Sequence, residues 1–181
     1  MFLSKKLKSH IEMKQSLTTT GLHILAAPAD KPVEERLRAY ARELKKKSCL
    51  GQIGFITSRS AVVPYLSVRS NIFLRGHEHD LDILPSFFTT DPNFLQERAD
   101  HISELQRIYI EFYRNALDGH RFIFMSDLAD GLDRASARRM MTDFDTSSRR
   151  LGISLMMLTS DQSMLRDFPD NSDTAPSQLF Q

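Results

Sequence analysis

Four short apolar runs limit the folds open to this chain more than any other feature. The runs are "LHILAAP" from Leu22, "IGFIT" from Ile53, "FIFMS" from Phe122 and "ISLMMLT" from Ile153. Each has the length and composition of a strand, and helical or loop-like sequence separates one from the next. Strands that are apolar on both faces are typical of a parallel sheet covered by helices. The sequence therefore predicts an α/β protein.

The intervening segments predict the covering helices. Residues 33–47 follow Pro32 and place apolar side chains at helical spacing, with glutamates early and lysines late, which suits the helix dipole. Two further helices are predicted: one from Asp91 or Asn93 to a glycine cap at Gly119, with a break allowed before Ile102, and one over about 134–150. The stretch between residues 68 and 91 favours loops with short helical pieces.

Length and composition limit the class of protein. A chain of 181 residues is long enough for one well-buried domain, which we place at 1–170, with a polar and flexible tail at 171–181. The formal net charge of +1 provides no global field for nucleic acid. The single cysteine, Cys49, excludes an internal disulfide and fits a reducing cytoplasm. No apolar run approaches the roughly 20 residues of a membrane span, so we expect no direct membrane insertion.

A continuous stretch from Ile102 carries a series of motif-like segments. It reads "ISELQ", then Arg114 within a helical stretch, then "FIFM" followed by Ser126 and Asp127, then "DGLD" ending at Asp133. In order and spacing, this stretch resembles the signature, Walker B strand and D-loop of ATP-binding cassette (ABC) transporter ATPase domains. "IGFITSRSAVVPYLSVRSNI" resembles the Q-loop segment of the same family, and "LGISLMMLTSDQSML" resembles its H-loop strand.

The resemblance covers most of the chain and implies a fold and partners. It implies a P-loop-NTPase-like parallel sheet with a reduced helical subdomain at about 68–106. It also implies association with an ABC ATPase subunit, as a homo- or heterodimer, with a membrane permease, or with both. The segment after the Q-loop would receive the permease, which makes Ser58, Pro64, Tyr65 and Leu66 the candidate interface residues. The expected location is cytoplasmic, or peripheral at the inner face of the membrane through a partner.

The phosphate-binding loop departs most from the family pattern. A Walker A loop wraps phosphate with glycine backbone N–H groups and a lysine. The corresponding stretch here, "ILAAPADKPVEE", has no glycine, two prolines, and Glu34 and Glu35 where a helix N-terminus would receive phosphate. Lys31 is a vestigial candidate for the missing lysine. A conventional phosphate cradle is therefore not expected.

The other chemical positions depart in the same sense. Ser126 stands where the family has the aspartate that orients magnesium, and Asp127 stands in place of the catalytic glutamate. The Q-loop glutamine corresponds to Ser58 and the H-loop histidine to Ser160. In the signature-like segment Ser103 and Gln106 match the pattern, whereas Glu104 replaces a glycine and would repel phosphate. We interpret Asp127 as an acid at a strand end rather than a base, and we expect no metal site.

These departures predict a catalytically inactive ABC-ATPase-like protein, a pseudo-ATPase that binds no cofactor and acts by association in a regulatory or assembly role. Two alternatives stay open. One is an ATP-binding and hydrolysing ABC transporter subunit with an unconventional site, using ATP and magnesium. The other is a structural interaction protein that binds no nucleotide. We expect no nucleic-acid partner, because acids are interleaved with the arginines.

Overall fold

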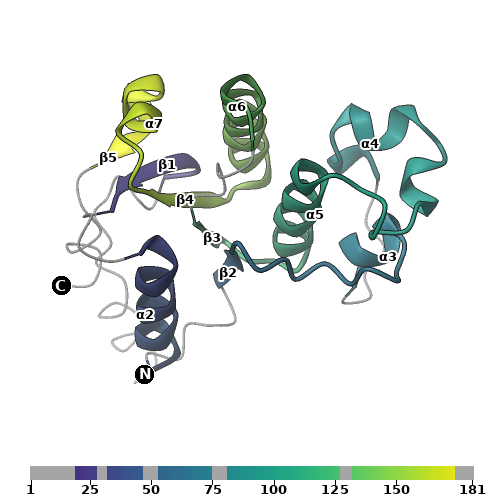
Figure 1. The fold of residues 1–181 in the computed structure, drawn as a ribbon, viewed down its shortest axis with the longest axis horizontal. Coiled ribbons are helices and arrows are strands. Elements are labelled where there is room, and N and C mark those ends of the chain that lie inside the picture. Colours follow the sequence, from purple (N-terminus) through teal and green to yellow (C-terminus); the bar gives the residue numbers. More distant parts are fainter. Residues whose placement is uncertain (1–18, 28–31, 47–52, 75–80, 127–131, 174–181) are drawn as a thin grey trace, which may run out of the picture.

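A sheet of five parallel strands forms the centre of the fold, in the order β2-β3-β4-β1-β5 (Figure 1). The computed structural model describes residues 19–27, 32–46, 53–74, 81–126 and 132–173. The strands are β1 (Gly21–Ala26), β2 (Ile53–Ile56), β3 (Phe122–Met125), β4 (Ser154–Thr159) and β5 (Ser172–Asp173). The first four are the predicted apolar runs, and the predicted parallel α/β fold is confirmed.

Helices cover both faces of this sheet, as Figure 1 shows for α2 on one side and α6 and α7 on the other. The helices are α2 (Val33–Lys46), α5 (Glu104–Leu117), α6 (Arg134–Leu151) and α7 (Gln162–Asp167). Side chains alternate between the faces, as strand geometry requires. Phe124 of β3 packs in one cluster with Leu37 of α2, while its neighbour Met125 packs in the other cluster with Phe112 of α5. Both faces are therefore apolar.

Helix α5 begins later than the sequence predicts. The start expected at Asp91 or Asn93 is wrong, because α5 begins at Glu104, and residues 91–102 form turns around a single 3₁₀ turn, η4 (Phe94–Gln96). Ser103 is the reason. Its side chain accepts a hydrogen bond from the Gln106 backbone N–H, and Gln106 Oε1 accepts one from the Ser103 N–H. This capping box fixes the start of the helix.

A glycine follows each of the helices α5 and α6, and the one after α5 is the predicted cap. Gly119 follows α5 with φ +81°, and Gly152 follows α6 with φ +69°. This left-handed conformation carries little cost only for a residue without a Cβ. Each helix can therefore turn sharply into the strand that follows it.

The tail does not begin at residue 171. Asn171 belongs to a 3₁₀ turn, η5 (Pro169–Asn171), and Ser172 and Asp173 form β5, which pairs with β1. Polar side chains hold this segment: Asn171 Nδ2 donates to the Leu22 carbonyl at 2.9 Å, and Ser172 Oγ donates to the carbonyls of Leu165 and Phe168. A polar composition therefore did not mean loss of structure here. Residues 174–181 lie outside the described part of the chain.

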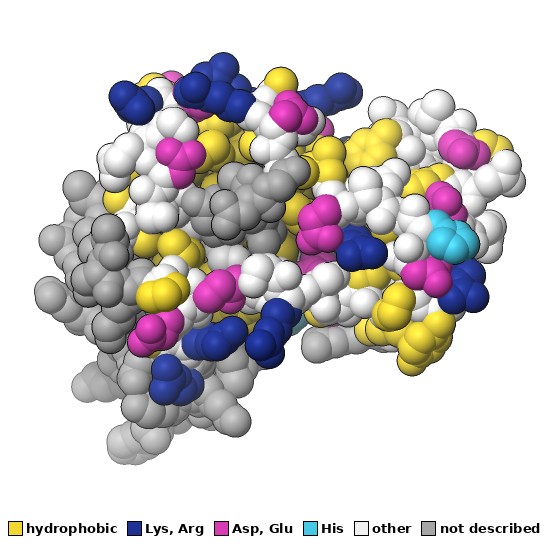
Figure 2. Space-filling view, in the orientation of Figure 1, with side chains coloured by type: hydrophobic (Ala, Val, Ile, Leu, Met, Phe, Trp, Pro, Cys, Tyr) yellow, Lys and Arg dark blue, Asp and Glu magenta, His cyan; other side chains and the backbone are white. Residues whose placement is uncertain are grey.

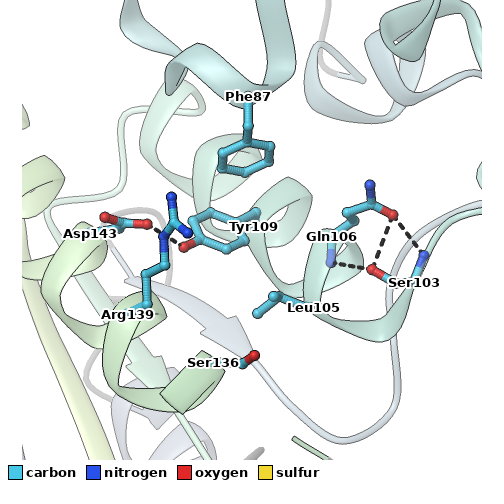
Figure 3. Close-up of a pocket in the computed structure, with 8 residues that line it drawn as sticks. All are labelled: Phe87, Ser103, Leu105, Gln106, Tyr109, Ser136, Arg139 and Asp143. Atoms are coloured by element: carbon cyan, nitrogen blue, oxygen red, sulfur yellow. Dashed lines mark hydrogen bonds between the residues drawn. The ribbon is translucent and has the colours of Figure 1, made fainter. Parts of the chain in front are cut away.

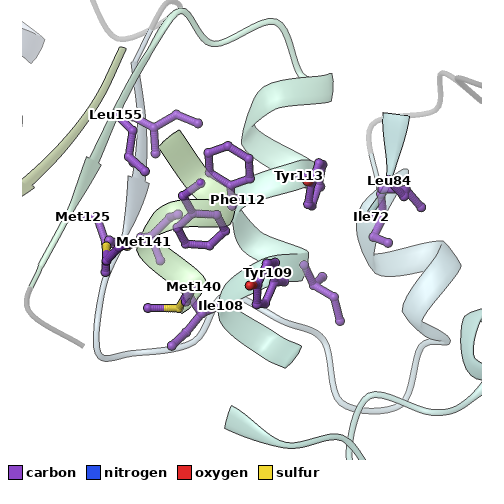
Figure 4. Packing of buried hydrophobic residues seen from close by; sticks show 14 of the residues in the cluster. Ile72, Leu84, Ile108, Tyr109, Phe112, Tyr113, Met125, Met140, Met141 and Leu155 are labelled. Carbon is purple, nitrogen blue, oxygen red and sulfur yellow. The ribbon is translucent and has the colours of Figure 1, made fainter. Parts of the chain in front are cut away.

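A group of short helices packs against α5 on the side away from the rest of the sheet (Figure 1). It comprises α3 (Val68–Ile72), η3 (Leu81–Ile83) and α4 (Ser86–Thr90), together with η4. Figure 4 shows how α5 joins this group to the sheet: Tyr113 lies on the side of Ile72 and Leu84, whereas Phe112 lies on the side of Met141 and Leu155. The same helix is buried on two faces.

The surface carries mixed charge. Among the coloured residues in Figure 2, basic and acidic side chains are interspersed over the face that is drawn. Within the described part of the chain, no helix combines the length and apolar character that crossing a bilayer requires.

Candidate functional site

Three strand ends and one helix start form the edge of the sheet where the sequence predicts a vestigial site. Ser58 follows β2, Ser126 follows β3 and Ser160 follows β4, while α2 follows β1. Because the strands are parallel, their carboxyl ends meet at one edge, the usual place for ligands in α/β sheets. Lys31 and Asp127, two of the predicted residues, lie outside the described residues.

Glu34, in the first turn of α2, joins two of these strand ends. Its Oε1 accepts a hydrogen bond of 2.8 Å from the hydroxyl of Ser126 and another of 2.8 Å from the backbone N–H of Ser58. Ser126 is 1% exposed. One carboxylate thus ties the Q-loop position and the Walker B position to the helix start. Ser160 is exposed and takes no part in these contacts.

The Glu34 carboxylate is ionised at neutral pH. Partial burial raises its pKa, but the hydrogen bonds from the Ser58 backbone and the Ser126 hydroxyl lower it by more, and Arg38 adds to the lowering, so that the net shift is downward. A negative charge also suits the positive end of the α2 dipole. The site therefore carries a built-in anion at the position where a P-loop protein receives phosphate.

This lowered pKa predicts how the contact responds to pH. Stabilisation by the charged form is fully present above about pH 4.5, the ordinary value, and is lost as pH falls through the lower pKa of the folded state. We expect Glu34→Gln to lower the free energy of unfolding most near neutral pH, and the difference from wild type to shrink in acid. Denaturant titrations between neutral and acidic pH measure this. In a Ser126→Ala background the effect of Glu34→Gln should be smaller, and an undiminished effect there would contradict the contact.

The residues present do not fit a conventional magnesium–nucleotide site. Ser126 offers a neutral hydroxyl in place of a carboxylate, and that hydroxyl already donates to Glu34. Among the residues that the structure describes, no group of three or more His, Cys, Asp or Glu side chains is arranged to hold a metal ion. Glu34, Ser126 and the Ser58 backbone are bonded to one another and are not arranged as ligands for a magnesium–nucleotide complex.

The signature-like residues have a structural explanation. Ser103 and Gln106, the two that match the family pattern, are the two partners of the capping box of α5. Glu104 lies in the first turn and pairs with Arg107 at 3.3 Å. An S-x-x-Q pattern at a helix start satisfies two backbone N–H groups whatever the protein does. The match at this motif is therefore a match in helix capping.

The D-loop residue Asp133 is the N-cap of α6. Its Oδ1 accepts hydrogen bonds from the backbone N–H groups of Ala135 and Ser136, each at 3.0 Å, and Oδ2 accepts one from the Ser136 hydroxyl. These bonds, led by the Ser136 hydroxyl, hold the pKa of Asp133 below its ordinary value. Asp161, beside the H-loop position, caps α7 in the same way. Both residues set helix starts.

A buried polar network fixes the segment after the Q-loop position. Asn71 of α3 is fully buried; its Oδ1 accepts from the Val63 N–H at 2.8 Å, and its Nδ2 donates to the Val63 carbonyl at 2.9 Å. Arg114 of α5 donates to Asn71 Oδ1 at 2.9 Å and to the Ala61 carbonyl at 2.9 Å. These bonds hold a stretch of chain that has no helix or strand of its own.

Glu111, one turn before Arg114, fixes the start of the same segment. Its Oε1 accepts from the Ser60 hydroxyl and from the Ala61 N–H, each at 2.7 Å. Burial raises the pKa of Glu111, although these two bonds and Arg114 act in the opposite direction. Side chains of α3 and α5 thus fix the backbone of residues 60–67.

Three of the four predicted interface residues belong to this fixed segment, whereas Ser58 lies at the strand ends, where its N–H donates to Glu34. Pro64 is exposed, Leu66 is half-buried, and Tyr65 is 71% exposed, more than any other large apolar residue in the described part of the chain. An aromatic side chain held outward by a rigid backbone is a typical anchor for a protein partner. The Tyr65 ring is therefore exposed on a segment whose backbone is already ordered.

Sequence reasoning did not place Glu34, Asn71, Glu111 or Arg114 in the candidate site. Glu34 was recognised only as an obstacle to phosphate, because its partners are 24 and 92 residues away. The sequence does hold a signal for Glu111 and Arg114. They are three residues apart in an otherwise apolar helical stretch, and buried charges at such spacing need polar partners.

No protein-family model and no curated protein matches this chain. Among solved structures, it is similar to cbiO1 from Clostridium perfringens, described as part of the ABC transporter complex cbiONQ. The TM-score is 0.61 at 12% identity, over 78% of this chain and 68% of that chain. The chain has the fold of an ABC transporter ATPase. At this identity the likeness shows the α/β, P-loop-NTPase-like fold alone.

Proposed function

We propose that this chain is a catalytically inactive ABC-ATPase-like protein, a pseudo-ATPase that acts by association with an ABC transporter ATPase or permease in a regulatory or assembly role. The observation that carries the proposal is the Glu34 carboxylate, which bonds both Ser126 and the Ser58 backbone. Three positions that would handle magnesium and phosphate are thereby engaged with one another.

Electrostatics favours this inactive role. A P-loop site binds a polyanion through backbone N–H groups at a helix N-terminus. Here the first turn of α2 holds an ionised carboxylate of its own, and a like charge disfavours a second anion nearby. Binding of phosphate at the same place would require displacement of Glu34 from Ser126 and Ser58. We therefore expect nucleotide affinity to be poor even though the sheet is intact.

An association role is supported by the segment that presents Tyr65. Five hydrogen bonds join residues 60–63 to Glu111, Arg114 and Asn71, and none of these bonds involves the vestigial site. The segment corresponds to the surface that, by resemblance, receives a permease. A role in association explains why a polar network would keep this surface rigid in a protein without turnover, with the cytoplasmic face of a membrane complex as the place of action.

Calorimetric titration with Mg-ATP and a phosphate-release assay test the inactive state. We expect flat heats and no turnover above buffer for the wild-type chain. Glu34→Gln removes the carboxylate charge and therefore tests whether that charge is what disfavours nucleotide binding. Glu35→Gln, in the same turn, is its matched control, because among the described residues the bonds to Ser58 and Ser126 come from Glu34 and none from Glu35. Saturable micromolar binding by the wild type, or turnover that disappears in Asp127→Ala, would instead favour an ATP-hydrolysing subunit with an unconventional site.

Co-purification tests the association. From detergent-solubilised native membranes, the tagged chain should retain an ABC ATPase or permease identified by mass spectrometry. Tyr65→Ala should weaken this retention, whereas replacement of another exposed aromatic, Phe87→Ala, should leave it intact. Retention of neither class of partner would point to a structural interaction protein unrelated to transport.

A further inference from the structure

A hollow of about 340 Å³ lies between α4, the start of α5 and α6, away from the vestigial site at the strand ends (Figure 3). The described residues that line it are Phe87, Ser103, Leu105, Gln106, Tyr109, Ser136, Arg139 and Asp143. Sites for small molecules commonly enclose about 300–1,000 Å³. The hollow is therefore large enough for a small ligand and too small for a folded partner.

Apolar side chains from two helices form part of its wall. Phe87 of α4 and Tyr109 of α5 meet edge to face, with ring centroids 4.8 Å apart at 76°. Phe87 is 38% exposed, although the neighbouring Phe88 is fully buried. Leu105 lies below these rings in Figure 3. The wall can thus receive an aliphatic or aromatic group of one side chain's size.

Two opposite charges on α6 also line the hollow. Arg139 and Asp143 are four residues apart, a spacing at which helical side chains are neighbours, yet no ion pair joins them. Within the described structure Arg139 makes no hydrogen bond or ion pair. Asp143 uses Oδ2 to accept from the Tyr109 hydroxyl at 2.6 Å, and no hydrogen bond to its Oδ1 is found among the described residues.

Gln106 adds a donor. Its Oε1 is engaged by the N–H and hydroxyl of Ser103 in the capping box, which orients the amide. The Nε2 group points away from Ser103 in Figure 3 and makes no hydrogen bond within the described residues. The hollow therefore offers a cation and an amide donor, an anion, and an apolar wall within one small volume.

We propose that this hollow binds a free α-amino acid with an apolar side chain. Its carboxylate would pair with Arg139, its ammonium with Asp143, and its side chain would lie against Phe87, Leu105 and Tyr109. A simple carboxylate would meet the charge of Asp143, and a simple amine would meet that of Arg139, so only a zwitterion satisfies both. This site is separate from the Glu34 contact and goes beyond the association role.

Thermal unfolding and calorimetry with defined ligands test the proposal. L-phenylalanine and L-leucine at millimolar concentration should raise the melting temperature of the full chain and give saturable heats. Glycine, which lacks the apolar group, 3-phenylpropionate, which lacks the ammonium, and phenethylamine, which lacks the carboxylate, should each bind at least tenfold more weakly. A comparable response to 3-phenylpropionate or phenethylamine would overturn the zwitterion assignment, and a comparable response to glycine would overturn the role of the apolar wall. No response to any ligand would overturn the site.

Variants locate the binding. Arg139→Gln and Asp143→Asn should each weaken L-phenylalanine binding at least tenfold. Both remove a charge and leave a polar amide; asparagine also keeps the size of aspartate and can still accept from Tyr109. Arg121→Gln is the matched control, since Arg121 is an exposed arginine that does not line the hollow. Each variant's melting temperature without ligand separates lost binding from lost folding. Unchanged affinity in a folded Arg139→Gln protein would contradict the proposal.

Discussion

Asn71→Ala should lower the free energy of unfolding by about 3–5 kcal/mol, through the loss of a buried polar network. Asn71 is fully buried, and alanine would remove the acceptor of the Val63 N–H and of the Arg114 guanidinium, as well as the donor to the Val63 carbonyl. Each buried group left without its partner costs about 1–3 kcal/mol. Urea titration measures the change, with unfolding followed by far-ultraviolet circular dichroism.

The matched control is Asn93→Ala, in an exposed turn before η4. Its side chain makes no hydrogen bond within the described residues, so the change should stay within about 0.5 kcal/mol. Hydrogen exchange supplies a second readout: the Val63 amide should lose protection in Asn71→Ala relative to amides of the central strands. Equal losses of stability in the two variants, with the Val63 amide still protected, would show that the network does not hold this segment.

The network also gives a structural explanation for some of the matches to the family pattern. Arg114 and Asn71 lie in segments whose resemblance to the ABC family was visible in the sequence, yet their contacts serve the backbone of residues 61–67 and no ligand. Ser103 and Asp133, which match the signature and D-loop patterns, likewise cap helices. The residues that match the family pattern at these positions therefore have structural roles in this fold.

Four of the five strands could be predicted from the sequence because they are buried on both faces, whereas β5 lies in the segment predicted to be a flexible tail. Phe122–Met125 and residues 155–158 within β4 are continuous apolar runs, a pattern with few alternative explanations. The start of α5 was less readable, because apolar residues continue upstream of Ser103 as turns that pack on α3 and α4. Phe94 and Leu95 are buried there without belonging to an α-helix. Periodicity shows burial but does not by itself distinguish a helix from packed turns.

The candidate site was predictable only in part. The sequence identified Ser58 and Ser126 as altered positions, but not their shared partner Glu34, since a contact over 92 residues has no local signal. The hollow beside Arg139 and Asp143 was also not anticipated, because its wall comes from three helices that meet only in the folded chain. Residue types can be read locally, whereas the pairing of residues depends on the packing of the helices.

That packing is the basis of the second large effect: Phe144→Ala should cost about 3–5 kcal/mol of the free energy of unfolding. Phe144 of α6 is fully buried, stacks on Phe112 at 4.4 Å between ring centroids, and meets Tyr109 edge to face at 5.0 Å. Alanine would leave a cavity between α6 and α5, because the ring contacts Tyr109 and Phe112 of α5. Denaturant titration measures the loss.

Phe87→Ala is the control, because Phe87 also contacts Tyr109 but is partly exposed. It should cost less than about 1 kcal/mol, since solvent can fill the space that the ring leaves. A loss in Phe144→Ala no larger than that in Phe87→Ala would contradict a rigid α5–α6 core. Such a core matters for both proposals: α5 carries Glu111 and Arg114, which fix the Tyr65 segment, and α6 carries Arg139 and Asp143. A rigid α5–α6 core would mean that the Tyr65 segment and the hollow beside Arg139 are both supported by the buried contact between Phe112 and Phe144.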